Sequence, residues 1–197
     1  MQLQGSITAL TTPFTESGML DLGAWRAQID MQIRSGTAAV VVAGSTGEAA
    51  TLSDEEYSQL IELAAIRVAG RIPVLAGTGL SSTAKTIRQT KLAKDSGADV
   101  ALVVTPPYVR PTQAGLHAHY LAVADAAGIP VVLYNVPGRT GCDLQPQTVA
   151  RLYGHGNIIG LKEAVGDEAR WEELYPLASP AFSLLSGDDP TFVRAIA

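Results

Sequence analysis

The alternation of apolar runs with amphipathic stretches predicts an α/β fold built on a parallel sheet. Short apolar runs return at the spacing of one strand–helix–strand unit, about 30 residues. These runs are apolar throughout and do not alternate with polar residues, which indicates a sheet that is covered on both faces. No linker, low-complexity tract or shift in composition divides the chain, so we expect residues 1–197 to form a single domain.

Seven apolar runs are the expected strands. In chain order they are Ser6–Leu10, Ala38–Ala43, Pro73–Ala76, Val100–Thr105, Pro130–Tyr134, Ile158–Lys162 and Ser183–Leu185. The segments between them carry helix start and stop signals. Ser53 and Glu56 form a capping box, and Pro146 and Pro190 each fit the first turn of a helix. Glycines that fit helix ends follow four of the expected helices: Gly36, Gly70, Gly97 and Gly128.

The hydrophobic pattern alone leaves two architectures open, a doubly wound open sheet and a closed barrel. Polar residues follow almost every expected strand, and these clusters favour the barrel. In a barrel, all the carboxyl ends of the strands converge on one face, whereas an open sheet gathers only those at its switch point. The clusters are Thr11–Thr12, Gly44–Glu48, Gly77–Gly79, Thr105–Tyr108, Tyr134–Asn135, Lys162–Glu163 and Ser186–Asp189.

Composition excludes several classes of protein. The net charge is −5 with acids and bases interspersed, so a nucleic-acid partner is disfavoured. The apolar runs are too short to span a bilayer, and Met1–Gly5 lacks the pattern of a signal peptide, so we expect no membrane partner and a cytoplasmic location. The single cysteine, Cys142, fits a reducing compartment. With one cysteine and three histidines, the chain offers few ligands for zinc, and no metal site is expected.

Two weaker patterns need mention. Gly77-x-Gly79 follows a strand but lacks the third glycine and the later acidic residue of a dinucleotide-binding motif. Asp188 and Asp189 could suggest a metal site, yet adjacent acids before a proline are more typical of helix capping.

Lys162 is the most informative residue, because it ends an apolar strand. Lysine is almost never fully buried unless it is paired. Burial lowers the pKa of an ammonium and makes the amine a usable nucleophile. On position alone, the commoner outcome is a lysine that extends to solvent from the strand end.

Three motifs occur in order: Gly44-Ser45-Thr46-Gly47-Glu48, Tyr134–Gly141 and Gly160-Leu161-Lys162-Glu163. With these motifs the chain resembles the dihydrodipicolinate synthase / N-acetylneuraminate lyase family of class I aldolases, from Gly5 to its last residue. The resemblance implies a (β/α)₈ TIM barrel and a Schiff base between pyruvate and Lys162. Tyr134 ends the preceding strand, at the level of Lys162, and its phenol could carry protons.

The resemblance also implies roles for other residues. Thr46 and Tyr108 resemble the residues that, with the tyrosine matching Tyr134, form the proton relay of the family. In that family the tyrosine that matches Tyr108 comes from a neighbouring subunit, which implies a homo-oligomer, either a dimer or a dimer of dimers (a homotetramer).

Substrate-binding roles follow in the same way. Ser45 and Thr46 lie in a turn that could hold the pyruvate carboxylate, and Ser45 stands where family members commonly carry threonine. Gly187 is expected to leave room beside the keto acid. Arg139 is the expected specificity residue, because a guanidinium matches a carboxylate with two parallel hydrogen bonds.

The implied activity is a lyase that condenses pyruvate with L-aspartate 4-semialdehyde to 4-hydroxy-tetrahydrodipicolinate, in lysine and diaminopimelate biosynthesis. No cofactor is expected. One alternative is cleavage of a sugar acid, by an N-acetylneuraminate lyase or a keto-deoxy-sugar-acid aldolase. Arg139-Thr140-Gly141 argues against that alternative, because a sugar aldehyde requires partners for its hydroxyls. An alternative of another class is a catalytically inactive binding or regulatory relative, against which intact Lys162, Tyr134 and Thr46 argue.

Two further expectations depend on the resemblance. Seven strand signals are present, whereas the barrel needs eight and typically occupies about 250 residues, so we expect a barrel truncated after the seventh strand and incomplete at its C-terminus.

In lysine-inhibited members, the ammonium of the inhibitor meets an acidic side chain on the helix after the third strand. Lys85 stands there in this chain and Ala49 replaces a frequent serine, which predicts weak or absent inhibition by L-lysine.

Overall fold

The sheet consists of seven parallel strands in sequential order, β1 to β7. A computed structural model describes residues 1–195 of the chain. The strands are β1 (Ile7–Ala9), β2 (Ala39–Val42), β3 (Val74–Gly77), β4 (Val100–Val104), β5 (Val131–Asn135), β6 (Ile158–Glu163) and β7 (Ser183–Ser186). Each of the seven expected strands is therefore confirmed, with ends that agree within one residue.

Helices connect the strands. They are α1 (Leu22–Arg34), α2 (Asp54–Val68), α3 (Thr83–Asp95), α4 (Gln113–Ala127), α5 (Pro137–Thr140), α6 (Pro146–Leu152), α7 (Glu168–Leu174) and α8 (Phe192–Ala195), with 3₁₀ turns η1 (Ala49–Thr51) and η2 (Tyr175–Leu177). Within residues 1–195, none of these helices is both long enough and apolar enough to cross a membrane.

The helix boundaries follow the local signals, with one exception. Ser53 and Glu56 form the predicted capping box at the start of α2, each side chain bonding to the other residue's backbone N–H. Pro146 begins α6, as expected. The prediction for Pro190 is wrong, because α8 begins only at Phe192. The residues before α8 form a turn instead, in which the Thr191 hydroxyl and N–H both donate to Asp188.

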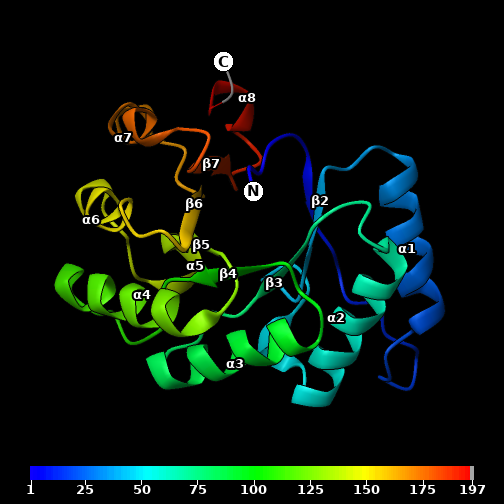
Figure 1. Cartoon of the computed structure of the whole chain (residues 1–197). Helices are drawn as coiled ribbons and strands as arrows, with labels where there is room; N and C mark the ends of the chain where they lie inside the picture. Colours follow the sequence, from blue (N-terminus) through cyan, green and yellow to red (C-terminus); the bar gives the residue numbers. More distant parts are fainter. Residues whose placement is uncertain (196–197) are drawn as a thin grey trace.

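The sheet curls so that the helices lie on its outside (Figure 1). Two apolar clusters fill the space between the sheet and these helices. A third cluster fills the inside of the curl, with buried side chains from β2 to β5 and from the N-terminal segment, among them Val41, Leu102 and Tyr134. The Leu3 N–H donates to the Ser183 hydroxyl (3.0 Å) and joins that segment to β7. This arrangement confirms the α/β barrel class, and within residues 1–195 β1 and β7 are the edge strands of the sheet.

The pair Gly77 and Gly79 has a packing role. A Cβ on Gly77 would lie 2.1 Å from the Ala43 carbonyl oxygen, and one on Gly79 would lie 2.4 Å from the Val104 nitrogen. The glycines therefore allow the end of β3 to approach the backbones of its two neighbours, β2 and β4. Ala43 itself takes a left-handed conformation (φ 50°), and it begins the turn that carries Ser45 and Thr46.

Candidate active site

Lys162 and Tyr134 face each other inside the curled sheet. They are register partners on β6 and β5, and the Lys162 Nζ lies 4.5 Å from the centre of the Tyr134 ring. Tyr134 is buried and belongs to the inner apolar cluster, while Lys162 is half-buried. The expectation that the two residues share one level of the barrel is confirmed, because parallel pairing brings the ends of adjacent strands together.

The surroundings of Lys162 favour its neutral amine. Burial lowers the pKa of Lys162 below the ordinary value for lysine, the Asp189 carboxylate acts in the opposite direction, and the Arg139 guanidinium lowers the pKa further. A larger fraction of the side chain is therefore uncharged near neutral pH than for a lysine in water. The uncharged amine is the form that attacks a carbonyl carbon, so this shift favours such an attack.

The Tyr134 phenol has a hydrogen-bond partner in the turn after β2. Burial raises the pKa of Tyr134, and a hydrogen bond to the Ser45 side chain and the charge of Arg139 lower it, while Asp189 raises it. The turn is closed by hydrogen bonds from Gly47 N and Ala49 N to Gly44 O (3.1 and 3.3 Å). Ser45 is the residue of this turn that acts on the pKa of Tyr134. Ser45 and Thr46 are both exposed, and the part of Thr46 in the relay stays a prediction.

Gly187 leaves room for Lys162. A Cβ at Gly187 would lie 2.4 Å from the Lys162 Cε and 3.1 Å from its Cγ. The Gly187 N–H donates to the Glu163 carbonyl (2.7 Å), which holds the loop after β7 against the end of β6. Gly187 was expected to leave room for the keto acid. In the structure, the atoms that a Cβ at Gly187 would meet first belong to the Lys162 side chain.

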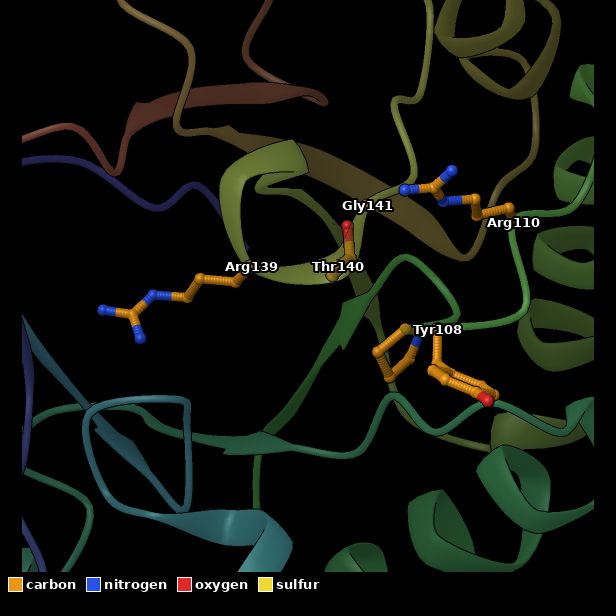
Figure 2. A pocket seen from close by; sticks show the side chains of 6 residues that line it. Tyr108, Arg110, Arg139, Thr140 and Gly141 are labelled. Atoms are coloured by element: carbon orange, nitrogen blue, oxygen red, sulfur yellow. The ribbon is translucent and has the colours of Figure 1, made fainter.

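A pocket of about 570 Å³ lies between the loop after β4 and α5, and is shown in Figure 2. It is lined by Pro107, Tyr108, Arg110, Arg139, Thr140 and Gly141. Arg139, on α5, extends to one side of Thr140, and Arg110 lies on the other side. Arg139 lowers the pKa of both Lys162 and Tyr134, so its positive charge acts at the reactive centre.

Tyr108 is held in an unusual conformation. Its φ is 73°, in the left-handed region that bulky residues rarely occupy, and its N–H donates to the Thr140 carbonyl (3.0 Å). The side chain is 92% exposed, so it does not pack on Tyr134 within one chain. Strain of this kind is costly and gathers at functional sites, and the role of Tyr108 in a neighbouring subunit stays a prediction.

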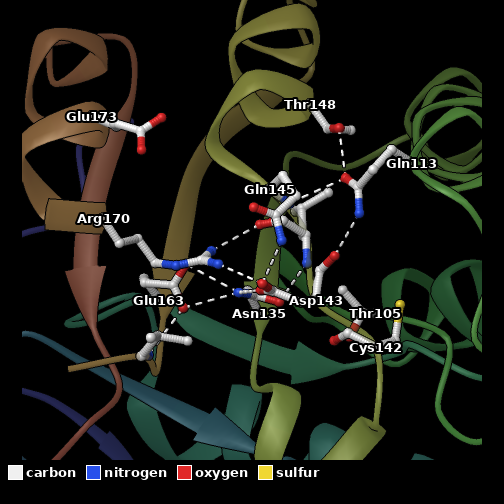
Figure 3. Close-up of polar contacts among 12 residues, drawn as sticks. Thr105, Gln113, Asn135, Cys142, Asp143, Gln145, Thr148, Glu163, Arg170 and Glu173 are labelled. Atoms are coloured by element: carbon white, nitrogen blue, oxygen red, sulfur yellow. Dashed lines mark hydrogen bonds and ion pairs between the residues drawn. The ribbon is translucent and has the colours of Figure 1, made fainter. Parts of the chain in front are cut away.

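A buried polar network behind the site was missed from the sequence. Asn135 and Glu163 follow Tyr134 and Lys162 by one position and therefore point to the opposite, helix-covered face of the sheet. Both are fully buried, Asn135 Nδ2 donates to the Glu163 carboxylate (3.0 and 3.1 Å), and Arg170 on α7 donates to Glu163 (3.1 Å) (Figure 3). The available signal was a glutamate inside an apolar strand, which requires a buried partner.

The effect of Asp189 on the site was also not predicted. Its charge raises the pKa of both Lys162 and Tyr134. Its neighbour Asp188 accepts a hydrogen bond from the Thr191 hydroxyl in the turn before α8, so it closes that turn and does not cap the helix. Within residues 1–195, no group of three or more His, Cys, Asp and Glu side chains is arranged to hold a metal ion.

Comparisons with known proteins agree with this geometry. The family model "Dihydrodipicolinate synthetase family" matches residues 2–197. The chain is 63% identical, over 196 residues, to a 4-hydroxy-tetrahydrodipicolinate synthase of Stenotrophomonas maltophilia and 60% identical to one of Xylella fastidiosa. It aligns over its whole length with both and spans 66% and 65% of theirs.

Solved structures give the same result. The dihydrodipicolinate synthase of Acinetobacter baumannii, solved in complex with pyruvate, superposes with a TM-score of 0.95 at 46% identity, over 98% of this chain and 66% of that one. The enzyme of Cyanidioschyzon merolae, solved with lysine bound, gives a TM-score of 0.92 at 39% identity, over 97% and 65% of the two chains. Sequence, fold and the pairing of Lys162 with Tyr134 lead to one conclusion: the chain belongs to the dihydrodipicolinate synthetase family.

Proposed function

We propose that this chain carries the reactive centre of a class I aldolase-type lyase, a 4-hydroxy-tetrahydrodipicolinate synthase. It condenses pyruvate with L-aspartate 4-semialdehyde to 4-hydroxy-tetrahydrodipicolinate, in lysine and diaminopimelate biosynthesis. The observation that carries the proposal is the amine of Lys162, half-buried and 4.5 Å from the centre of the Tyr134 ring. The names of the relatives and the pyruvate complex of the Acinetobacter enzyme support the choice of reaction and of first substrate.

The chemistry follows from that amine. The neutral Nζ of Lys162 attacks C2 of pyruvate, and loss of water from the resulting carbinolamine gives an imine. The imine nitrogen withdraws electrons, so C3 loses a proton and the enamine forms. The enamine carbon then attacks the aldehyde carbon of the second substrate, and the aldehyde oxygen takes up a proton. The amino group of that substrate attacks C2, which closes the ring and releases Lys162 as the free amine. The Tyr134 phenol, bonded to the Ser45 hydroxyl, donates and accepts protons in these steps. No cofactor is required, because the imine itself is the electron sink.

The two carboxylates have separate partners in this proposal. Hydroxyl and N–H groups of Ser45 and Thr46 hold the carboxylate of pyruvate. Arg139 holds that of the semialdehyde, and its influence on the pKa of Lys162 supports this assignment. A sugar aldehyde carries no such carboxylate, so Arg139 favours the semialdehyde over the sugar-acid alternative.

We further propose a cytoplasmic homo-oligomer, a dimer or a dimer of dimers, in which Tyr108 completes the site of a neighbouring protomer. The strained, exposed conformation of Tyr108 supports this role. The proposal can be checked by mixing the inactive variants Tyr108→Phe and Lys162→Ala. Mixed dimers contain one site with both residues intact, so activity should return on mixing. No recovery in verified mixed dimers would show that Tyr108 acts within its own chain.

Trapping with borohydride tests the covalent step. Pyruvate plus borohydride should add a reduced pyruvyl group to Lys162, located by mass mapping of peptides. Lys162→Ala should abolish both the label and the condensation, while the exposed Lys85→Ala variant serves as a matched control and should lose neither. Active protein whose Lys162 carries no label would exclude the mechanism.

The acceptor role of Arg139 requires a separate comparison. Arg139→Ala should reduce kcat/KM for the semialdehyde about 100-fold, the usual effect of losing a charge-assisted pair. Imine formation with pyruvate should change far less. Equal loss of both steps would assign Arg139 a structural role.

A further inference from the structure

The buried network behind the site binds the segment that follows β5. Asn135 Nδ2 donates to the Asp143 carboxylate (2.8 Å), and its Oδ1 accepts from the Leu144 N–H (2.9 Å). Arg170, on α7, donates to the Leu144 carbonyl (3.0 Å) and to Asp143 (2.5 Å). The loop at 143–144 is thereby held from two directions, by the end of β5 and by α7 (Figure 3).

Glu163 completes this arrangement. One of its carboxylate oxygens accepts from Val165 N (3.0 Å) and the other from Arg170 Nη1 (3.1 Å). Its side chain is 1% exposed and that of Arg170 is 10% exposed. Every group that faces the Glu163 carboxylate is therefore a donor, and the guanidinium is its counter-charge. An arginine fork is the group that can join two carboxylates and a carbonyl at once.

The network matters most for α5. The pairing of Lys162 with Tyr134 is already held by the backbone ladder of β5 and β6. By contrast, α5 has only four residues and no side-chain cap at its start, and it ends at Gly141 in the left-handed conformation. So short a helix is not stable by itself and depends on its attachment points. Those points are Asn135 before it, the 143–144 loop after it, and Thr140 at its end, whose hydroxyl accepts from Thr105 (3.0 Å) and whose carbonyl accepts from the Tyr108 N–H (3.0 Å).

We propose that Arg170 is a positioning residue: through the 143–144 loop it holds α5 where Arg139 receives the carboxylate of the second substrate. Arg170 touches neither substrate nor Lys162. Glu163 and Asp143 serve the same purpose by orienting the guanidinium of Arg170. This inference depends on the proposed function for the role of Arg139, but the restraint on α5 can be measured without it.

A double-mutant cycle tests the coupling. Arg139→Ala alone should lower kcat/KM for the semialdehyde about 100-fold, and Arg170→Gln alone about 10-fold, through misplacement of Arg139. If Arg170 acts through Arg139, the double variant should be no worse than Arg139→Ala, because the effects of coupled residues do not add. The Arg170→Gln loss should lie mainly in the KM for the semialdehyde, with pyruvate trapping within about two-fold of the unmodified protein.

Two controls separate positioning from general damage. Arg151→Gln changes an exposed arginine on the neighbouring helix α6 and should leave both steps unchanged. If Arg170→Gln does not fold, Asp143→Asn enters the same cycle, since it keeps the side-chain volume at a position whose side chain is 32% exposed. Losses that multiply in the double variant, or a pyruvate step reduced as much as the semialdehyde step, would overturn the proposal.

Hydrogen exchange supplies a readout that does not depend on activity. In Arg170→Gln the amides of Gly141 and Leu144 should exchange at least about 10-fold faster, with little change at Val132 in β5. Unchanged exchange at both amides would refute the restraint itself. If the unmodified protein forms no imine, the proposed function fails, while the exchange data still decide whether Arg170 holds α5.

Discussion

Substituting alanine for Gly187 should remove activity while leaving the fold intact. The new Cβ would lie 2.4 Å from the Lys162 Cε, whereas carbon atoms in contact are about 3.5–4.0 Å apart, so the lysine stem must move by more than about 1 Å. A displacement of this size at a reacting group costs about 100-fold in rate. Because the lysine stem is flexible, the change in stability should be small. An off-rotamer side chain costs about 0.5–1.5 kcal/mol of stability. Replacing glycine by alanine stabilises the folded protein by about 0.4–1 kcal/mol, because it lowers the conformational entropy of the unfolded chain.

The assay pairs two measurements on the same protein. The rate of borohydride trapping of pyruvate at Lys162 reports the chemistry, and urea unfolding reports the stability. We expect the trapping rate to fall about 100-fold while the free energy of unfolding changes by less than about 1 kcal/mol. Gly154→Ala is the matched control, since nothing lies within 4 Å of a Cβ at Gly154. Trapping at the unmodified rate in Gly187→Ala would refute the packing argument.

Three other predictions concern charge. Asp189 raises the pKa of Lys162 and Arg139 lowers it. The pH profile of imine formation should therefore move to lower pH in Asp189→Asn and to higher pH in Arg139→Ala. Shifts in the opposite directions would contradict the effects assigned to these two charges. Burial lowers the pKa of His119 to about 4, and a folded pKa below the unfolded value means that the unfolded chain binds the proton first as the pH falls. About 3 kcal/mol of stability should therefore disappear between pH 6.5 and 4. His119→Asn should lose less over that range in urea titrations, and an equal loss would rule out His119 as the cause. L-lysine should inhibit weakly or not at all because of Lys85, and Lys85→Glu should increase inhibition; strong inhibition of the unmodified protein at sub-millimolar lysine would disprove this.

Much of the fold could be predicted because its signals are local. Apolar runs marked all seven strands, and the side-chain chemistry of Ser53 and Glu56 fixed the start of α2. Pro190 shows where such signals end. Its backbone fits a first helical turn, but the bonds between Thr191 and Asp188 close a turn there instead. A proline restricts its own backbone, but it does not determine which hydrogen bonds the residues around it form.

The site divides in the same way. Lys162, Tyr134, Arg139 and Gly187 were identified from motifs, and parallel pairing of consecutive strands places Tyr134 level with Lys162. The partner of Tyr134 was not predictable in this way. Ser45 and Thr46 are adjacent hydroxyl residues in one turn, and the motif does not indicate which of them lowers the pKa of the Tyr134 phenol; in the structure it is Ser45.

By itself, the sequence determined the order of strands and helices, the covered parallel sheet and the choice of Lys162 as the proposed nucleophile. These depend on hydrophobic periodicity, capping chemistry and motifs within short segments of chain. Only the tertiary structure decided which charges act on Lys162, why Gly187 has no side chain, and how Arg170 joins α7 to the loop after α5. Such effects depend on distances between residues far apart in the chain, and side-chain packing sets those distances only once the sheet has curled.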